Sequence, residues 1–372
     1  MIDSICDKSK CTACFACSNS CPVGAVTLKA DKNGRVYPVI SESCTECGLC
    51  LKVCPVNSPV VLNAPLEAFA FYSKDGEIRS SSTSGGLIHS AASVFDGIVY
   101  GAAYTDGLNV DCIRIEDKSE LYRIQGSKYV HSHVNAQYAS VKGDLESGKR
   151  VLFIGTPCQA AGLRSYLKKD YEGLYIIDFV CHGVCERQLL KDYISGELTN
   201  ADLNKATVRF RDSKGYNMTV SENGNKTVLP FSTNFYYHGF LEGWSLRENC
   251  HGCLYSRIER AGDLTACDCW GGNEEIKAEM KNGLNGVLVN TDKGRELLDS
   301  VKNNAVIIES SVNEARSGVV HLRHPMAETG LSMRFRMLSE KHGGYYALKN
   351  TVLKKKLAFM VRKIKNAGNS NN

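Results

Sequence analysis

The chain has no apolar run long enough to cross a bilayer, and no signal peptide precedes Ile5. We therefore expect a soluble or peripheral protein. Its net charge of +5 is small and comes largely from the last residues, and no nucleic-acid motif is present, so we expect no nucleic-acid partner. No G-x-G-x-x-G follows a predicted strand, which argues against a dinucleotide-binding fold.

Cysteine, in contrast, is abundant, with 17 residues in a chain of 372. In a short secreted chain this number would indicate a disulfide framework. Here 43% of the residues are hydrophobic, which is enough for a substantial core, and the cysteines cluster with metal-ligand spacing. This usage implies a reducing compartment, so we expect a cytoplasmic protein.

Two cysteine runs near the N-terminus share the spacing C-x2-C-x2-C-x3-C-P, by which bacterial ferredoxins hold two 4Fe–4S clusters. Three thiolates of one loop cap three irons, and the fourth cysteine of each run crosses to the other cluster. Zinc or disulfides are the alternatives, but zinc usually takes two separated cysteine pairs. One cluster is expected on Cys11, Cys14, Cys17 and Cys54, and the second on Cys44, Cys47, Cys50 and Cys21.

Beyond a polar, proline-containing linker at 57–65, the pattern changes to alternating strands and helices. The predicted class is α+β: a ferredoxin-like domain at 1–62, followed by α/β segments at 66–149 and 150–330 and by a basic helix and tail at 331–372. Strands are expected at Ala68–Tyr72, Ile98–Tyr104, Val110–Ile115, Val151–Gly155, Leu174–Val180, Thr207–Arg211, Tyr216–Val220, Val287–Asn290 and Val306–Glu309. Helices are expected at Leu87–Phe95, Ala160–Leu167, Phe231–Leu246 and Lys293–Val301, with a loop at Ser80–Gly86.

Two neighbouring strands of this pattern end in cysteine, which places two thiols at one edge of a sheet. Together with a later C-x2-C pair they make four thiols, so a third 4Fe–4S cluster is expected on Cys158, Cys181, Cys250 and Cys253. Cys185, Cys267 and Cys269 are alternative ligands for this cluster. Cys112 is interpreted as a buried apolar residue, and Cys6 as a redox-inert neighbour of the first cluster, with an additional ligand as the alternative.

A Ser/Gly-rich loop before a helix is able to cradle the phosphates of a flavin. The predicted binding residues are Ser82, Ser84, Gly85, Gly86, Lys128, Thr156 and Gln159. Lys128 would stabilise anionic reduced flavin and His182 would donate a proton, which makes these two the catalytic candidates. A flexible loop, a solvated lysine and a structural histidine are the ordinary alternatives.

These segments together resemble the beta subunit of coenzyme F-420 (8-hydroxy-5-deazaflavin) hydrogenase and dehydrogenase, an iron–sulfur flavoprotein family. The motifs are Ser82-Thr83-Ser84-Gly85-Gly86, Gln125-Gly126-Ser127-Lys128-Tyr129, Gly155-Thr156-Pro157-Cys158-Gln159-Ala160, Asp178 through His182-Gly183, Phe210-Arg211-Asp212, Cys250-x2-Cys253 and Arg260-x2-Asp263-Leu264-Thr265-x2-Asp268-x-Trp270-Gly271. The resemblance implies a flavin, usually FAD with FMN as the alternative, beside a cluster in the catalytic domain. It also implies that 66–149 and 150–330 are the N-terminal-type and C-terminal-type domains of that subunit. The sequence departs from the family where Cys185, Cys267 and Cys269 stand.

The function expected from these features is that of a flavin- and iron–sulfur-dependent oxidoreductase. It would pass electrons from a donor protein, a ferredoxin or reductase, to a small organic substrate that is deazaflavin-like, otherwise conjugated, or sugar-linked. The alternative is an electron-transfer subunit of a larger hydrogenase or dehydrogenase complex without a substrate of its own. A purely structural metal-binding protein is disfavoured, because it would not need the ferredoxin spacing.

The C-terminal segment Leu353–Lys365 interleaves basic and apolar residues with helical spacing. One interpretation is a helix that lies on the anionic inner face of the membrane. The alternative is a last helix docked on the body with a solvated basic face. Asn366–Asn372 has the composition of a disordered tail.

Overall fold

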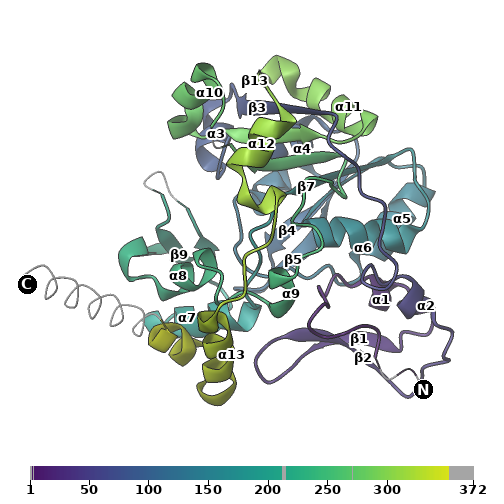
Figure 1. The fold of residues 1–372 in the computed structure, drawn as a ribbon, viewed down its shortest axis with the longest axis vertical. Coiled ribbons are helices and arrows are strands. Elements are labelled where there is room, and N and C mark those ends of the chain that lie inside the picture. The colour runs from purple at the N-terminus through teal and green to yellow at the C-terminus, as the bar shows by residue number, and fades with distance from the viewer. Residues whose placement is uncertain (1, 3, 212–214, 270, 352–372) are drawn as a thin grey trace, which may run out of the picture.

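The computed structural model describes residues 2, 4–211, 215–269 and 271–351. The predicted segments Leu353–Lys365 and Asn366–Asn372 lie outside the described residues. The predicted α+β class is confirmed: a small N-terminal module with both cysteine runs precedes a larger part built on a mixed sheet (Figure 1). No helix in the described ranges is long and apolar enough to span a membrane.

The N-terminal module (residues 4–62) is built from two similar halves. Strands β1 (Val26–Ala30) and β2 (Val36–Ile40) pair antiparallel, and the short helices α1 (Ala16–Asn19) and α2 (Leu49–Lys52) each begin inside a cysteine run. The residues before these helices, Phe15 and Gly48, have φ values of 69° and 70°. The earlier residues Ala13 and Glu46 also have positive φ, 49° and 55°. The two cysteine loops therefore repeat one backbone conformation, as two equivalent cluster loops require.

The larger part contains an eight-stranded sheet whose central strands are parallel. Its order is β13 (Ala305–Ser310), β3 (Glu67–Ser73), β12 (Asn285–Val289), β11 (Leu264–Asp268), β7 (Leu174–Phe179), β6 (Val151–Gly155), β4 (Ile98–Tyr104) and β5 (Val110–Ile115). Strands β4, β6, β7 and β11 are parallel, and the flanking strands pair antiparallel. β6 is buried along its whole length and β7 at all but its last residue, as expected for strands covered on both faces.

Helices cover both faces of this sheet. α4 (Leu87–Val94) and α11 (Asp292–Val301) pack on one face, while α5 (Gln137–Glu146) and α6 (Pro157–Leu167) contribute to the core of the other. That second core continues into the N-terminal module through Cys14, Phe15 and Val26. The module therefore sits directly on the α5–α6 layer (Figure 1).

A third core lies beside a separate three-stranded sheet of β8 (Thr207–Arg209), β9 (Met218–Glu222) and β10 (Asn225–Leu229). It is packed with α7 (Arg187–Glu197), α8 (Phe235–Leu241) and α13 (Gly330–His342). The remaining elements are α3 (Gly76–Ser81), α9 (Glu248–His251), α10 (Glu274–Glu279), α12 (Val312–Gly318) and the 3-10 turns Lys118–Ile124, Phe231–Thr233, Met280–Asn282, Lys302–Asn304 and Val320–Leu322.

Two local expectations differ from the structure. The helix predicted over Phe231–Leu246 ends at Leu241, because Gly243 adopts a left-handed φ of 78°. The loop predicted from Ser80 begins later, because Asp75 caps α3 and the helix runs to Ser81. The ranges 66–149 and 150–330 both supply strands to one sheet, so the division at 149/150 is not a boundary of that sheet.

Candidate redox site

The four cysteines predicted for the first cluster lie together and are buried. We call Cys11, Cys14, Cys17 and Cys54 the first site. Burial raises the pKa of Cys14 to about 12 and also raises that of Cys17, and the charges of Cys11 and Cys54 add to both effects. The backbones of Ala13, Ala16 and Ser18 hydrogen-bond to Cys11, Cys14 and Cys17, as cluster thiolates require.

Cys6 lies beside this site without belonging to the predicted ligand set. Its side chain hydrogen-bonds to Cys11 and Cys54, which lowers their pKa values to about 7 and about 6. The same bonds raise the pKa of Cys6 itself. This thiol is therefore a hydrogen-bond neighbour of two predicted ligands.

The second site, defined by Cys44, Cys47, Cys50 and Cys21, lies closer to solvent. Burial raises the pKa of Cys50, and the charges of Cys44 and Cys21 contribute, so these three thiols are neighbours. Cys47 is exposed. The backbone N–H of Ala25 donates to the Cys21 Sγ at 3.2 Å. Of the two sites in the module, this one faces outward.

The third site, defined by Cys158, Cys181, Cys250 and Cys253, is assembled from three elements of the larger part. Cys158 lies in the first turn of α6, Cys181 follows β7, and α9 carries Cys250. Burial raises the pKa of Cys181 to about 12, with the charges of Cys158 and Cys253 adding to it. Burial also raises the pKa of Cys250, again with Cys181 and Cys253 contributing. The structure thus brings the four predicted thiols together.

A glycine permits this assembly. Gly183 has a φ of 118°, and a Cβ there would lie 2.6 Å from the Leu246 Cδ1 and 3.3 Å from the Cys250 Cβ. A larger residue would push α9 away from the end of β7. The alternative ligands have other surroundings, since Cys185 contacts the Ser245 hydroxyl at 3.3 Å and Cys267 is buried beside Asp268 and Cys269.

None of the groups of His, Cys, Asp and Glu in the described residues is arranged to hold one metal ion. A 4Fe–4S cubane is a different case, because each of its four thiolates binds a separate iron. The residues present fit such a group: the thiols are neighbours, and N–H groups reach Cys21 and Cys181.

The first and third sites adjoin each other. The charges of both Cys11 and Cys158 contribute to the raised pKa of Cys14, after its burial. Tyr255 is buried between the two sites: burial raises its pKa, with Cys158, Cys14, Cys253 and Cys54 contributing. The first site therefore lies beside the third, while the second site lies toward solvent.

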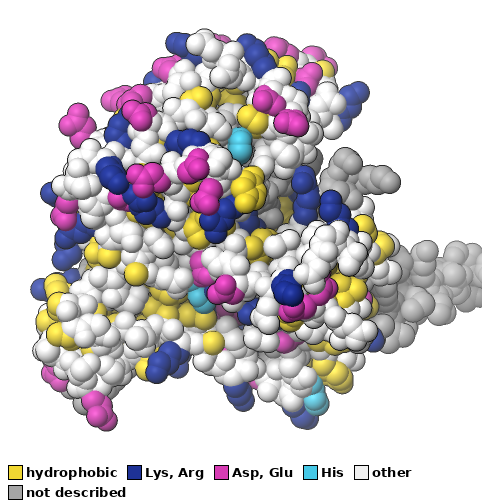
Figure 2. All heavy atoms as spheres, turned by 180° about the vertical axis from the view of Figure 1, so that it is seen from behind, with side chains coloured by type: hydrophobic (Ala, Val, Ile, Leu, Met, Phe, Trp, Pro, Cys, Tyr) yellow, Lys and Arg dark blue, Asp and Glu magenta, His cyan; other side chains and the backbone are white. Residues whose placement is uncertain are grey.

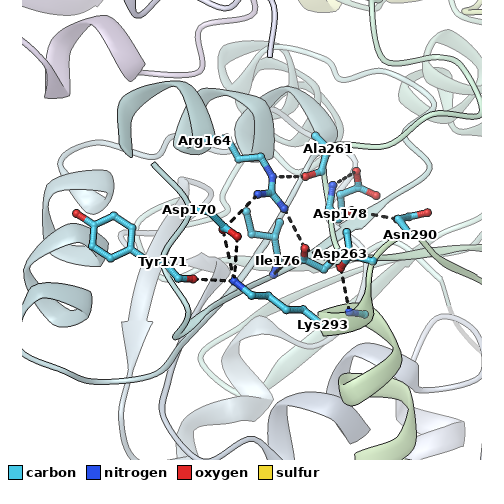
Figure 3. A network of polar contacts seen from close by, with 12 residues as sticks. Arg164, Asp170, Tyr171, Ile176, Asp178, Ala261, Asp263, Asn290 and Lys293 are labelled. Carbon is cyan, nitrogen blue, oxygen red and sulfur yellow. Dashed lines mark hydrogen bonds and ion pairs between the residues drawn. The ribbon is translucent and has the colours of Figure 1, made fainter. Parts of the chain in front are cut away.

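Buried polar residues of the predicted motifs surround this arrangement, and Figure 3 shows the network around Arg164 and Asp263 together with Asp178. The Asp178 carboxylate accepts hydrogen bonds from Arg260, from the Thr265 hydroxyl at 2.6 Å and from the Gly262 N–H at 3.0 Å. Arg260 also donates to the Tyr255 carbonyl at 3.0 Å, which fixes the chain that follows Cys253. In the neighbouring network, Arg164 of α6 donates to the Ala261 carbonyl at 2.6 Å and to Asp263 at 3.0 Å.

A cavity of about 500 Å³ opens at the carboxyl ends of β4, β6, β7 and β11, where α/β folds place their ligands. Its lining includes the predicted residues Ser82, Ser84, Gly86, Lys128, Thr156, Gln159 and His182, and also Cys181 of the third site. Gly85 lies behind the loop, where a Cβ would come within 2.1 Å of the Phe71 carbonyl oxygen. Gly85 therefore packs closely against β3.

Hydrogen bonds join the loop before α4 to the loop at 125–128. The Ser127 N–H donates to the Thr83 hydroxyl at 2.9 Å, and the Gln125 side chain donates to Ser81 at 2.7 Å. The Lys128 ammonium donates to the carbonyls of Gln125 and Gly126 at 3.1 and 3.2 Å. Burial lowers the pKa of Lys128 to about 7.

Several cavity residues were not predicted as site residues. Arg211 donates to the Tyr216 hydroxyl at 2.9 Å, and its Nε is buried without a partner among the described residues. His321 Nε2 lies 2.8 Å from His182 Nδ1, while His182 Nε2 lies 2.9 Å from the Phe240 carbonyl. Arg211 stands in a motif that the sequence displays, but no sequence signal marks His321. Lys128 and Arg211 both line the cavity, and Arg211 pairs with Asp268 at 3.9 Å, so the lining has more positive than negative side chains and favours an anionic ligand.

Comparison with known proteins finds a family match in the N-terminal module and another in the larger part. Residues 10–58 match the family model for a 4Fe-4S dicluster domain. Residues 148–315 match the model for the C terminus of the coenzyme F420 hydrogenase/dehydrogenase beta subunit. The chain carries the C-terminal domain of this beta-subunit family. The family resemblance seen in the sequence is therefore confirmed.

Two individual proteins are similar over most of their length. One of the F(420)H(2) dehydrogenase subunits of Methanosarcina mazei is 22% identical over 322 residues, which cover 80% of this chain and 84% of that protein. A chain in the structure of the F420-reducing [NiFe] hydrogenase complex from Methanosarcina barkeri is 17% identical, with a TM-score of 0.46. That likeness covers 80% of the present chain and 94% of the other.

Proposed function

We propose that this beta-subunit family protein is an iron–sulfur flavoprotein oxidoreductase that moves electrons from its N-terminal clusters through a flavin to an organic substrate. The observation that carries the proposal is the order of the sites. The second site faces solvent, the first adjoins the third, and Cys181 of the third lines the cavity. A 4Fe–4S cluster exchanges single electrons, whereas a flavin takes one or two and so couples to two-electron chemistry.

The cavity residues fit a flavin. Its volume of about 500 Å³ lies within the range of small-molecule and cofactor pockets. Ser82, Ser84 and Gly86 at the start of α4 would hold the phosphate part, since N–H groups at a helix N-terminus favour anions. Lys128 adds a positive charge, and Thr156 and Gln159 form the facing turn. FAD and FMN share these requirements.

The protein partner is proposed to be an electron donor that docks near Cys47. Figure 2 shows hydrophobic side chains gathered at the surface at the lower left, the region of the N-terminal module. Val23 and Val39 of that module are exposed. The named relative belongs to an F(420)H(2) dehydrogenase, which supports a deazaflavin-like substrate and keeps membership of a larger complex as the second candidate.

A cofactor inventory of anaerobically purified protein, followed by turnover, tests the proposal. We expect about twelve irons for three clusters and one flavin per chain. Cys47→Ser or Cys14→Ser should each remove one cluster and block ferredoxin-driven flavin reduction while flavin remains bound. Protein without flavin after reconstitution with FAD and FMN would refute the enzyme and favour the pure electron-transfer role.

A further inference from the structure

Arg247 is a buried cation that touches the chain segments of two cysteine sites. The residue is 5% exposed. In the N-terminal module its Nη2 donates to the Cys11 carbonyl at 3.4 Å and to the Val36 carbonyl at 3.2 Å. Its own carbonyl accepts the Cys250 N–H at 3.0 Å, at the start of α9. One residue therefore joins the first site to the third.

The guanidinium is fully engaged at this position. It forms an ion pair with Glu186, donates from Nε to the Asn249 side chain at 3.2 Å and lies 5.8 Å from the centre of the Tyr37 ring. The Glu186 side chain is also largely buried, and its Oε2 has no hydrogen-bond partner among the described residues. A buried ion pair usually contributes little net stability, because desolvation of both charges opposes their attraction. The pair is better explained by the electrostatic effect of its charges on the neighbouring cysteine sites.

Two of the charged groups beside Arg247 belong to predicted cluster ligands. Burial disfavours the charged form of Arg247, but Glu186, Cys250 and Cys11 together raise its pKa. When a 4Fe–4S cluster is reduced, one electron is added to a group that four thiolates already make anionic. A fixed cation nearby makes that addition more favourable, since net charge is one of the factors that set a cluster's potential. A guanidinium remains charged at all physiological pH values.

We propose that Arg247 is a positioning residue that docks the N-terminal module on the larger part and raises the reduction potential of the cluster on Cys11, Cys14, Cys17 and Cys54. This inference rests on the proposed function, because it assumes that electrons pass from the first to the third site. The electron that the first cluster gains comes from the second, and it leaves toward the third. The negative charge of Glu186 opposes this effect of Arg247 and limits the increase in reduction potential.

The test is an anaerobic redox titration of the full-length holoprotein, followed by electron paramagnetic resonance. In Arg247→Gln we expect the first cluster to become harder to reduce by roughly tenfold in its reduction equilibrium, which is about 59 mV for one electron. Glu186→Gln should shift the same couple in the opposite direction, toward easier reduction. Arg247→Lys keeps the charge and should stay near wild type. Arg114→Gln, which breaks a 2.8 Å ion pair with Asp144, is the matched control and should leave the potential unchanged.

If Arg247 is only structural, Arg247→Gln and Glu186→Gln should both lose stability, and the reduction potential of the first cluster should not shift in opposite directions in the two variants. Unchanged potentials in Arg247→Gln and Glu186→Gln with full iron content would overturn the inference. If Arg247→Gln does not fold, the direction of the shift in Glu186→Gln decides, and a shift toward harder reduction would refute it. A wild-type protein that lacks the third cluster or flavin contradicts the proposed function instead, since the potential of the first cluster is measured independently.

Discussion

Gly162 lies against Cys14: a Cβ on this glycine would be 3.0 Å from the Cys14 Cβ and 3.1 Å from its Sγ. Gly162 belongs to α6, which also carries Cys158, so this contact sets how closely the first and third sites approach. Glycine inside a helix costs roughly 0.5–1 kcal/mol relative to alanine. The close approach of the N-terminal module explains why the helix has a glycine here.

Replacing Gly162 with alanine or valine should therefore separate the two sites. The added carbon would also lie 2.8 Å from the Tyr138 hydroxyl, so we expect a destabilisation of about 1–3 kcal/mol from overpacking. Iron content should fall, and electron transfer from the N-terminal clusters to the flavin should slow more in the valine variant. Gly143→Ala in α5 is the control, because a Cβ there meets nothing within 4 Å. If both Gly162 variants keep the stability and the electron-transfer rate of the wild-type protein, the contact with Cys14 is not required.

Local sequence patterns predict the fold better than they predict the cavity. Strands Ile98–Tyr104 and Val110–Ile115 occur with their predicted bounds, because the first is a nearly continuous apolar run and the second is rich in apolar residues. The two N-terminal cysteine sites have a local signal in their thiol spacing, whereas the third site joins cysteines that lie far apart in the chain. Arg211 and His321 reach the cavity only through tertiary packing, from the end of a short strand and from a 3-10 turn. Arg211 stands in a family motif that does not by itself predict this position, and no local pattern marks His321.

Arg260→Met should remove the third cluster indirectly, because Arg260 holds the chain around the ligands and is not itself a ligand. The variant leaves the Asp178 carboxylate, which is 0% exposed, without its ion-pair partner. Breaking a buried pair in this way costs about 3–5 kcal/mol. The chain after Cys253 also loses its hydrogen bond to Arg260, so iron content should fall by about one cluster. Thermal unfolding and iron analysis measure both effects. Arg257→Gln breaks an exposed pair with Glu259 and should change stability by less than about 1 kcal/mol.

Cys250→Ser and Cys185→Ser form a matched pair that tests the ligand set of the third cluster. Both thiols are buried, but Cys250 has Cys181 and Cys253 as neighbours whereas Cys185 contacts Ser245. We expect Cys250→Ser to lose one cluster, about four irons, because a serine oxygen is a poor replacement for a soft thiolate. Cys185→Ser should keep the full iron content. The opposite result would exchange their roles and make Cys185 a ligand.

Lys128 should make flavin binding depend on pH. Burial lowers the pKa of Lys128 to about 7, so the side chain is charged below pH 7 and neutral above it in the empty cavity. In the unfolded chain the lysine stays charged up to about pH 10.4, so folding without ligand becomes more favourable as pH rises through this window. A flavin phosphate, in contrast, binds best to the charged form. Affinity should therefore fall as pH rises above 7.

The other groups that face the cavity do not produce this dependence. Burial lowers the pKa values of His89, His182 and His321, that of His321 to about 4, and Arg211 remains charged. We expect the dissociation constant of FMN to rise several-fold between pH 6 and 9 in the wild-type apoprotein and to be weaker but flat in Lys128→Met. Riboflavin, which lacks the phosphate, is the matched ligand and should bind with little pH dependence in both proteins. An FMN affinity with the same pH profile in Lys128→Met as in wild type would place the phosphate away from this lysine, because no other cationic side chain named here changes its charge over that range.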